Sequence, residues 1–346
     1  NKFMIIYETK MLSIKNKILK ILILFLRTFP PEAASSLSLN SIKFINSINK
    51  NFLRAHIDSK FKKISYKNLE FKHCLGLAAG IDKKGKYFDV LGSIGFSFVE
   101  VGTFTPLAQK GNDFPRIKRI AEEQSLINRL GFNNPGIIKG VQNIIKSKHN
   151  FSGILGVSIG KNKDTLIEDA YKDYVYCLER CFLVADYVAI NISSPNTLNL
   201  RKLSSEDYID HLTKELTHKA NFLKKCHKKE VPIFLKLSPD EENANIEKII
   251  STSLSNGISG FIVSNTSLGE YKNITGGISG KLLKTKSLNM LKKVKNLLGN
   301  ESFVISSGGI SDKRDIQERL DNGAKLAQIY TSFIYQGPKV VEEILN

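Results

Sequence analysis

The sequence lacks a long apolar segment. Its most apolar stretch, residues 11–29, contains an unbroken apolar run of only six residues, Ile21–Leu26. A helix that crosses a bilayer needs about 20 such residues, and the apolar region of a secretory signal needs about 7–15. The sequence therefore argues against a membrane span. It also argues against a signal peptide, although the small residues Ala33, Ala34 and Ser35 follow.

Cysteine and metal-binding patterns are scarce as well. The four cysteines, Cys74, Cys177, Cys181 and Cys226, have no zinc-binding spacing, so we interpret them as structural thiols in a reducing compartment. His and carboxylate residues form no cluster typical of a metal site. No G-x-G-x-x-G motif follows an opening strand, which disfavours a Rossmann site.

A phosphate-binding P-loop is also disfavoured. The segment Gly156–Asn162 has three residues between its glycines where a P-loop has four. Asn162 stands where Ser or Thr would bind magnesium.

Acidic residues are few in the first part of the chain. Residues 1–67 contain 13 Lys and Arg but only three Asp and Glu, a net charge of +10 out of +18 for the whole chain. The pattern predicts two amphipathic basic helices, within residues 11–29 and from Pro31 to Phe52. Such helices are typical of a segment on an anionic membrane, of a hairpin packed on the main domain, or of both. A general lysine bias is a further explanation of the charge.

From about residue 69 the sequence alternates between short apolar runs rich in β-branched residues and amphipathic helical stretches, such as Ser204–Cys226 and Asp240–Asn256. Eight strands in this alternation predict a (β/α)8 barrel, residues 69–346, preceded by a small N-terminal helical segment, residues 1–68. The predicted strands are Leu75–Ala79, Phe96–Val101, Ile154–Ile159, Tyr187–Ile192, Pro232–Leu237, Gly260–Ser264, Ser302–Ser306 and Lys325–Tyr330.

Polar or glycine residues lie at the end of every predicted strand. In a (β/α)8 barrel these ends meet at one rim, where active sites are found. After the seventh strand, Gly308 and Gly309 would let backbone N–H groups approach a phosphate, together with the N-terminus of the next helix. Lys236 lies inside an apolar strand and needs a negative charge nearby, such as that of a reduced flavin. The rim therefore predicts a phosphorylated cofactor rather than a metal.

The fourth strand end, within Tyr187–Arg201, is the most polar of the eight. Its strand is followed directly by Asn, Ser and Thr residues around Pro195. Amide and hydroxyl groups suit a neutral, amide-rich heterocycle. Taken alone, a turn that satisfies its own backbone is the simpler explanation. The other seven polar strand ends favour a binding site.

Five segments match one known family in order. Together they resemble the class 2 dihydroorotate dehydrogenases, the quinone-linked, membrane-associated flavoenzymes of pyrimidine synthesis. The resemblance covers about residue 30 to the C-terminus and implies oxidation of (S)-dihydroorotate to orotate, with FMN as cofactor and a membrane quinone as electron acceptor. The segments are Leu77-Ala-Ala-Gly-Ile-Asp-Lys83, Asn128-Arg-Leu-Gly-Phe-Asn-Asn134, Ile159-Gly-Lys-Asn-Lys-Asp164, Asn191-Ile-Ser-Ser-Pro-Asn-Thr197 and Gln328-Ile-Tyr330.

The resemblance also implies the residues that react. Ser194 is the implied catalytic base, at the position where the soluble class 1 relatives carry Cys. Thr197 and Phe132 are implied in the proton relay. The implied substrate contacts are Lys83, Asn128, Arg129, Leu130, Gly131, Phe132, Asn191, Asn196, Asn265 and Thr266.

The implied cofactor and quinone sites show three departures from the family. Ser158 and Ser264 replace the usual Asn and Thr, and Ser35 stands where His is frequent. Arg119 and Tyr330 are the implied quinone contacts. The implied FMN contacts are Ala79, Gly80, Ile81, Asp82, Lys83, Thr103, Ser158, Asn191, Lys236, Ser264, Gly280, Gly309, Tyr330 and Thr331.

Two other functions fit part of the sequence. Dihydrouridine synthases are flavin barrels with a basic surface, but they need a catalytic Cys and an RNA-binding appendage, and the basic excess here is N-terminal. A non-enzymatic peripheral membrane protein would explain residues 1–67 but not the polar rim. We expect no nucleic-acid partner. The lack of a spanning helix and of an Arg-rich transit segment favours peripheral attachment to the cytoplasmic face of a bacterial inner membrane over an organelle.

Overall fold

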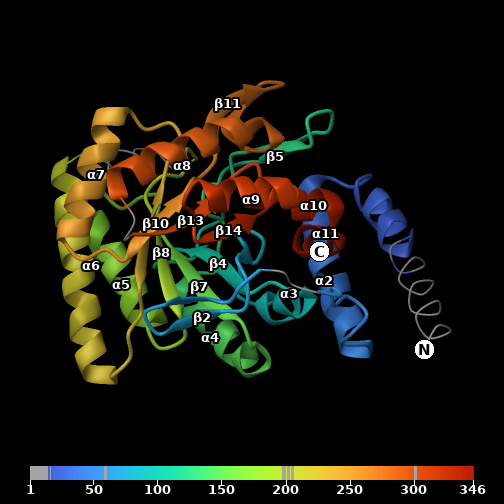
Figure 1. Cartoon of the computed structure of the whole chain (residues 1–346), viewed down its shortest axis with the longest axis horizontal. Helices are drawn as coiled ribbons and strands as arrows, with labels where there is room; N and C mark the ends of the chain where they lie inside the picture. Colours follow the sequence, from blue (N-terminus) through green and yellow to red (C-terminus); the bar gives the residue numbers. More distant parts are fainter. Residues whose placement is uncertain are drawn as a thin grey trace.

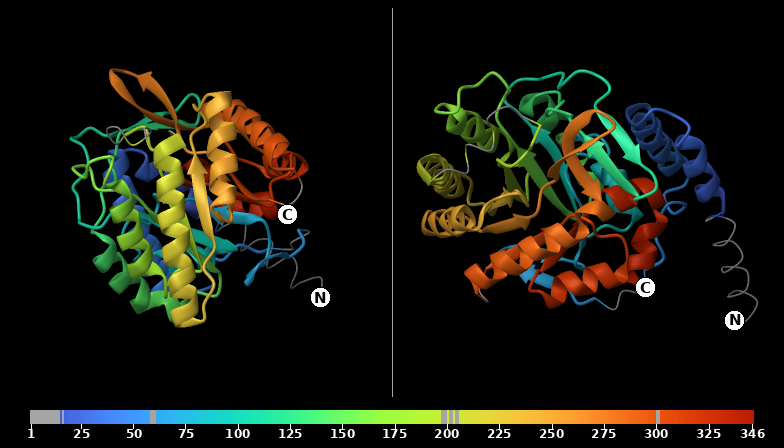
Figure 2. Two further views of the ribbon diagram at one scale, coloured as in Figure 1. Left: turned by 90° about the vertical axis from the view of Figure 1, so that its left-hand side faces the viewer. Right: turned by 90° about the horizontal axis from the view of Figure 1, so that it is seen from above.

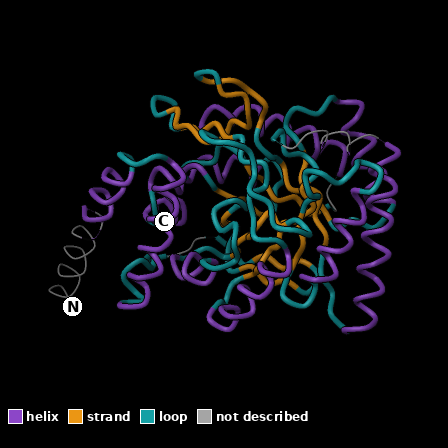
Figure 3. Tube along the Cα trace, turned by 180° about the vertical axis from the view of Figure 1, so that it is seen from behind, coloured by secondary structure: helices purple, strands orange, loops and turns teal. Residues whose placement is uncertain are grey.

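The computed structural model describes residues 15, 17–57, 61–196, 200, 203, 206–299 and 302–346. Eight parallel strands close into a barrel, and helices surround it (Figure 1 and Figure 3). The predicted (β/α)8 barrel is therefore confirmed. In their order around the barrel the strands are β10 (Gly260–Val263), β13 (Phe303–Ser307), β14 (Leu326–Ile329), β3 (Leu75–Leu77), β4 (Phe98–Phe104), β7 (Ile154–Ile159), β8 (Tyr187–Asn191) and β9 (Ile233–Leu237).

A helix follows each barrel strand in the chain. Both helical stretches named from the sequence are present, as α6 (Glu206–His227) and α7 (Asn243–Ser255). Residues at three- and four-residue spacing face the barrel: in α8, Leu288, Leu291 and Val294 are buried. The other helices are α3 (Phe88–Ile94), α4 (Ile137–Ser147), α5 (Ala170–Cys181), α8 (Lys284–Leu298), α9 (Lys313–Asp321), α10 (Thr331–Gln336) and α11 (Lys339–Leu345).

Aromatic side chains close the amino-terminal end of the barrel. An antiparallel hairpin, β1 (Ile64–Tyr66) and β2 (Leu69–Phe71), brings Tyr66 to this end. The ring centroid of Tyr66 lies 4.1 Å from that of Phe303 and 6.0 Å from that of Phe234. Packed rings leave no room for a ligand there, so the open end of the barrel is the carboxyl-terminal rim.

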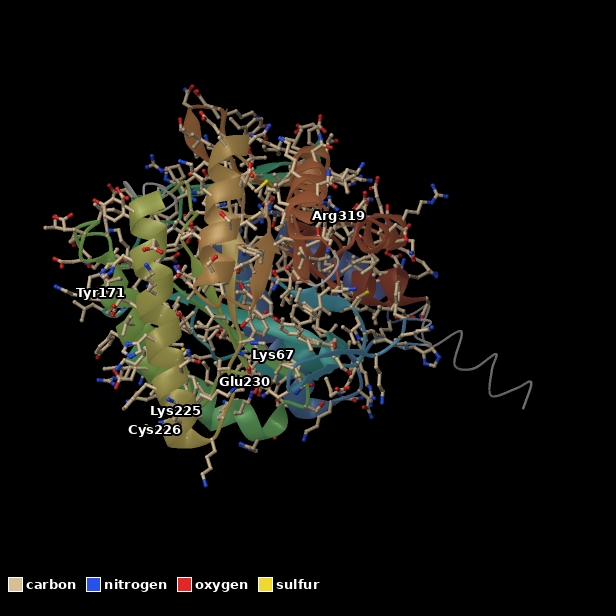
Figure 4. All side chains as sticks on the ribbon, turned by 60° about the vertical axis from the view of Figure 1, so that its left-hand side comes forward. Lys67, Tyr171, Lys225, Cys226, Glu230 and Arg319 are labelled. Atoms are coloured by element: carbon tan, nitrogen blue, oxygen red, sulfur yellow. The ribbon has the colours of Figure 1, made fainter. Side chains whose placement is uncertain are left out.

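An ion pair holds the turn of this hairpin. Lys67 Nζ lies 3.3 Å from an oxygen of Glu230, which precedes β9 (Figure 4). The predicted boundary between residues 68 and 69 lies at this turn. This boundary falls between β1 and β2, and the division of the chain into two segments at this point stays a prediction.

A second sheet, which the sequence did not predict, lies at the carboxyl-terminal end of the barrel (top of Figure 1). Its antiparallel order is β11 (Ser267–Tyr271), β12 (Ile274–Gly280), β6 (Ser125–Asn128) and β5 (Ile117–Ile120). These strands are inserted after β4 and β10, and β12 contains three glycines, which weakens its strand pattern. The sheet forms a wall beside the rim.

The N-terminal segment packs beside the C-terminal helices (Figure 2). Residues 17–26 are helical, and α2 (Pro31–Ile48) follows with Pro31 and Glu32 in its first turn. Proline and an acid are both favourable at this position, as the sequence predicted. No helix in the part of the chain that the structure describes is long and apolar enough to span a membrane.

Candidate active site

A pocket, here called the rim pocket, lies at the carboxyl-terminal ends of the barrel strands. Residues from seven of the eight strand ends and from the second sheet form its wall. The structure therefore brings together most of the predicted site residues. Those that line the rim pocket are Ala79, Gly80, Lys83, Thr103, Asn128, Leu130, Gly131, Phe132, Asn191, Ser194, Asn196, Lys236, Ser264, Asn265, Thr266, Gly280, Gly309, Tyr330 and Thr331.

The loop after β8 presents Ser194 to the rim pocket. Its side chain is buried, and its Oγ accepts a hydrogen bond of 3.3 Å from the backbone N–H of Asn196. The neighbouring Ser193 Oγ donates to the carbonyl of Lys236 at 2.6 Å and fixes the loop to β9. No acidic or imidazole partner of Ser194 is found among the described residues. Thr197 lies outside the described residues.

Four asparagines line the wall around Ser194. Asn196 Nδ2 donates to Asn128 Oδ1, and Asn265 Nδ2 donates to Asn191 Oδ1, each at 3.0 Å. The second pair continues to Thr103 Oγ1, which accepts from Asn191 Nδ2 at 3.2 Å. Mutual hydrogen bonds orient these amides, and the lone pairs and N–H groups that remain are available to a ring with alternating amide groups.

The end of the rim pocket near β13 suits a phosphate. Gly308 and Gly309 have positive φ angles of 109° and 71°, and a Cβ on Gly309 would lie 2.3 Å from the Cα of Lys284. Consecutive residues of this kind direct backbone N–H groups towards one point. Thr331 and Ser279 add hydroxyls, linked by a hydrogen bond of 2.8 Å. The donors fit the phosphate of a flavin nucleotide.

One expectation about this end is wrong. The helix after the seventh strand, α9, does not offer a free N-terminus, because Asp312 caps it and accepts from the backbone N–H of Asp315 at 2.9 Å. Asp315 itself accepts from Ser311 at the same helix end. The carboxylates of Asp312 and Asp315 therefore accept the N–H groups at this helix end, and Asp315 also pairs with Lys284.

Lys83, which follows β3, supplies a cation with unusual properties to the rim pocket. Burial lowers the pKa of Lys83 to about 8, although the Glu32 carboxylate acts in the opposite direction. Glu32 is held by Arg116, whose Nε donates to its two oxygens at 2.9 and 3.0 Å. Lys83 is therefore charged at neutral pH and loses its charge in the mildly alkaline range.

A second cavity, here called the head pocket, lies between the N-terminal helices and the barrel. It has a volume of about 770 Å³ and is lined on the helix side by Leu22, Phe25, Ile42 and other apolar residues. The rim pocket and the head pocket share Lys83, Asn128, Asn133, Ser279 and Tyr330.

Comparison with known proteins identifies the family. The family model of dihydroorotate dehydrogenase matches residues 39–346. The chain belongs to the dihydroorotate dehydrogenase family. It is similar to the dihydroorotate dehydrogenase (quinone) of Aliivibrio fischeri, with 39% identity over 91% of this chain and 95% of the relative. The corresponding protein of Vibrio atlanticus is 42% identical over 80% of this chain and 84% of the relative.

Solved structures of the same family agree. The dihydroorotate dehydrogenase of Eimeria tenella in complex with ferulenol superimposes with a TM-score of 0.81 at 31% identity, covering 89% of each chain. Its ligand-free form gives 0.80 at 31% identity, over 89% of this chain and 92% of that one. As a member of the dihydroorotate dehydrogenase family, the chain is an oxidoreductase.

Five residues implied by the resemblance to dihydroorotate dehydrogenases lie off the wall of the rim pocket. Ile81, Asp82 and Arg119 line the head pocket. Ser158 lies behind Thr103, with an Oγ–Oγ distance of 2.9 Å. Arg129 turns away and donates to the Asp113 carbonyl at 3.3 Å.

Lys161, the lysine of the P-loop-like segment, is buried within its own loop. Its Nζ donates to the carbonyls of Asn162 and Thr165, at 2.9 and 2.8 Å. Among the described residues, no group of three or more His, Cys, Asp and Glu is placed to hold a metal.

Sequence reasoning missed several charged residues beside the candidate site. Glu32 and Arg116 lie beside Lys83, and Glu100 lies below Lys236 inside the barrel. Glu100 could have been recognised from the sequence, because it is a charged residue in an apolar strand, the same feature that identified Lys236. The pairing of Glu32 with Arg116 could not have been recognised, because 84 residues separate them in the sequence.

Proposed function

We propose that the protein oxidises (S)-dihydroorotate to orotate, with FMN as its cofactor and a membrane quinone as the electron acceptor, in the biosynthesis of pyrimidine nucleotides (UMP). The observation that carries this proposal is the common wall of the two pockets. A polar pocket that contains Ser194 and four asparagines adjoins an apolar pocket, and Tyr330 borders both. A flavin at this wall can meet a polar substrate on one side and an apolar acceptor on the other.

FMN, when bound, would accept a hydride from the substrate and pass the electrons on. The Gly308–Gly309 backbone, Thr331 and Ser279 would hold its phosphate. Lys236, whose side chain lines the rim pocket, would place a positive charge against the ring system. Tyr330 is half-buried, and its desolvation raises its pKa to about 12, so its hydroxyl stays neutral beside the cofactor.

Ser194 would remove the proton from substrate C5. A serine hydroxyl is a weak base at its free pKa and needs a path that carries the proton away. We assign the proton transfer to Thr197, which would hold a water chain, and give Phe132, which has no proton to exchange, a shielding part in the relay. Phe132, on the wall of the rim pocket, would limit access of water to the reacting carbon. The four asparagines would hold the ring amides, and Lys83 would bind the carboxylate.

The head pocket would admit the quinone, with Arg119 and Tyr330 as polar contacts. Arg119 Nη1 donates to the Phe29 carbonyl at 2.8 Å and so ties the segment after the first helix to β5 of the second sheet. The N-terminal helices, residues 17–48, are here called the head. Some of their apolar side chains face outward, among them Phe44 at 66% and Ile48 at 71% exposure. Together with the basic charge, these side chains support peripheral attachment to an anionic membrane. We take this membrane to be the bacterial inner membrane and the attachment to be on its cytoplasmic face.

The deciding experiment measures dihydroorotate oxidation with quinone, fumarate or NAD offered separately. We expect purified protein to carry about one FMN per chain, to lose its flavin colour when dihydroorotate is added, and to regain it fastest with quinone. A colourless protein that takes up no FMN, or reoxidation that is faster with fumarate or NAD, would contradict the proposal.

A further inference from the structure

A layer of polar side chains lies inside the barrel, between the aromatic plug and the rim pocket. It consists of Glu100 from β4, Tyr187 from β8, Lys236 from β9 and Gln328 from β14. Glu100 is completely buried, and Lys236 is 6% exposed. Charges are expensive in such surroundings unless they are paired, so their presence calls for a reason.

The two oxygens of Glu100 have different partners. Oε2 accepts hydrogen bonds from the Tyr187 hydroxyl at 3.0 Å and from Gln328 Nε2 at 2.9 Å. Oε1 has no hydrogen-bond donor and faces Lys236 Nζ at 3.9 Å. Two neutral donors therefore fix the carboxylate, and its free oxygen is directed at the lysine.

Lys236 connects this layer to the rim pocket. Its side chain lines the pocket, whereas Glu100 does not. No hydrogen bond of Lys236 Nζ is found among the described residues, and the nearest charge is that of Glu100. Glu100 can therefore act on a bound molecule through Lys236, whose charge it faces, and through Gln328, which donates to it and also lines the pocket.

We propose that Glu100 is a positioning residue that offsets the charge of Lys236 beneath the flavin. This inference rests on the proposed binding of FMN in the rim pocket. A lone buried lysine would stabilise a negatively charged reduced flavin strongly. The Lys236–Glu100 pair has no net charge, so the flavin is held less tightly in its reduced state and gives up its electrons more readily to the quinone.

The test uses the FMN-loaded protein and sulfite, which binds flavins reversibly, bleaches their colour and binds more tightly when positive charge lies near the ring. We expect Glu100→Gln to lower the sulfite dissociation constant about tenfold, because Lys236 keeps its charge and loses its counter-charge. Glu100→Asp keeps the carboxylate and is the matched control, expected within about threefold of wild type. Equal effects of both variants, or no effect of Glu100→Gln, would overturn the proposal.

A second variant keeps the test decisive if Glu100→Gln does not fold. Tyr187→Phe removes one of the two donors that hold Oε2, so the carboxylate lies less firmly opposite Lys236 and sulfite binding should tighten about threefold, in the same direction as in Glu100→Gln but by less. Unchanged or weaker binding would count against the role of Glu100. Wild-type protein that binds no FMN would overturn both the proposed function and this inference, whereas normal FMN reduction with unshifted sulfite affinities would overturn the inference alone.

Discussion

The rim pocket and the N-terminal head differ in which side chains they bury and which they expose. Around the rim pocket, polar side chains from several strands are buried or half-buried and hydrogen-bonded to one another, as Asn191 and Asn265 are. In the head, apolar side chains such as Phe44 remain exposed. The first arrangement favours a fixed geometry for chemistry. The second favours contact with an apolar environment outside the protein.

The two regions meet through a short chain of polar contacts. Glu32 of the head binds Arg116, and Arg116 Nη1 donates to the carbonyl of Asn112 at 3.1 Å. Asn112 Nδ2 in turn donates to the carbonyls of Arg129 and Asn196. The head therefore reaches the loop that carries Ser194, and the comparison can be tested from both sides.

The largest effect is expected at Ser194. Ser194→Ala should slow flavin reduction by dihydroorotate roughly 10²–10⁴-fold, because the base acts in the transition state, while orotate affinity stays close to wild type. Stopped-flow flavin bleaching and orotate titration measure the two quantities. Ser194→Cys should keep part of the activity with a different pH profile. Wild-type reduction rates in Ser194→Ala would exclude this serine as the base.

The next effect concerns the pH dependence of substrate-anion binding. The pKa of Lys83 is lowered to about 8, so its charge is present below this pH and lost above it. Orotate affinity should therefore be constant from about pH 6.5 to 7.5 and approach a tenfold loss per pH unit above about 8. Lys83→Met should bind weakly at every pH. A flat wild-type profile, with FMN occupancy unchanged, would remove Lys83 from anion binding.

Deleting residues 1–29 should impair the reaction with quinone and leave the reaction with dihydroorotate at the rim pocket nearly unchanged. The deletion removes much of the basic charge and the carbonyls that Arg119 contacts. Binding to anionic vesicles should weaken, and reoxidation by a long-tailed quinone should slow about tenfold. Single-turnover bleaching by dihydroorotate and reoxidation by a small soluble acceptor should change little. Equal rates with both acceptors and unchanged vesicle binding would show that the segment is only structural.

The smallest effect is expected from Glu32→Gln, which weakens the contact between head and rim. Arg116 would hold Asn112 less firmly, and KM for dihydroorotate should rise about threefold with little change in kcat. Asp169→Asn is a matched control, because it removes an exposed ion pair with Lys172 at 2.7 Å whose two residues line neither pocket. If the two variants behave alike, the contacts from Glu32 to Asn196 do not influence substrate binding.

The barrel could be predicted because its signals are local. Each strand is a short apolar run between polar turns, and Ile154–Ile159 was predicted with its observed bounds. The second sheet and the plugging hairpin could not be predicted in this way, because their strands are partly exposed or, as in β12, rich in glycine. Their position depends on pairing between distant segments, such as Asn128 with Gly277.

The candidate site, like the fold, could be predicted only in part. Lys236 was identified because a charge in an apolar strand needs a partner, but the sequence could not show that Glu100 supplies it. A flavin was expected to meet this charge, and the structure adds a carboxylate, with Glu100 Oε1 3.9 Å from Lys236 Nζ. The capped end of α9 was missed for the same reason, since only the structure shows that Asp312 occupies it.

The uneven exposure of the four cysteines offers a way to measure how the protein sits on a membrane. Cys74, Cys177 and Cys181 are buried, and burial raises the pKa of Cys74 and Cys181 to about 12. Cys226 is exposed near the end of α6 that lies away from the rim (Figure 4). A thiol-reactive spin label or fluorophore should therefore attach at this one position without any engineered change. Its distance from the lipid surface would report the tilt of the barrel on the bilayer.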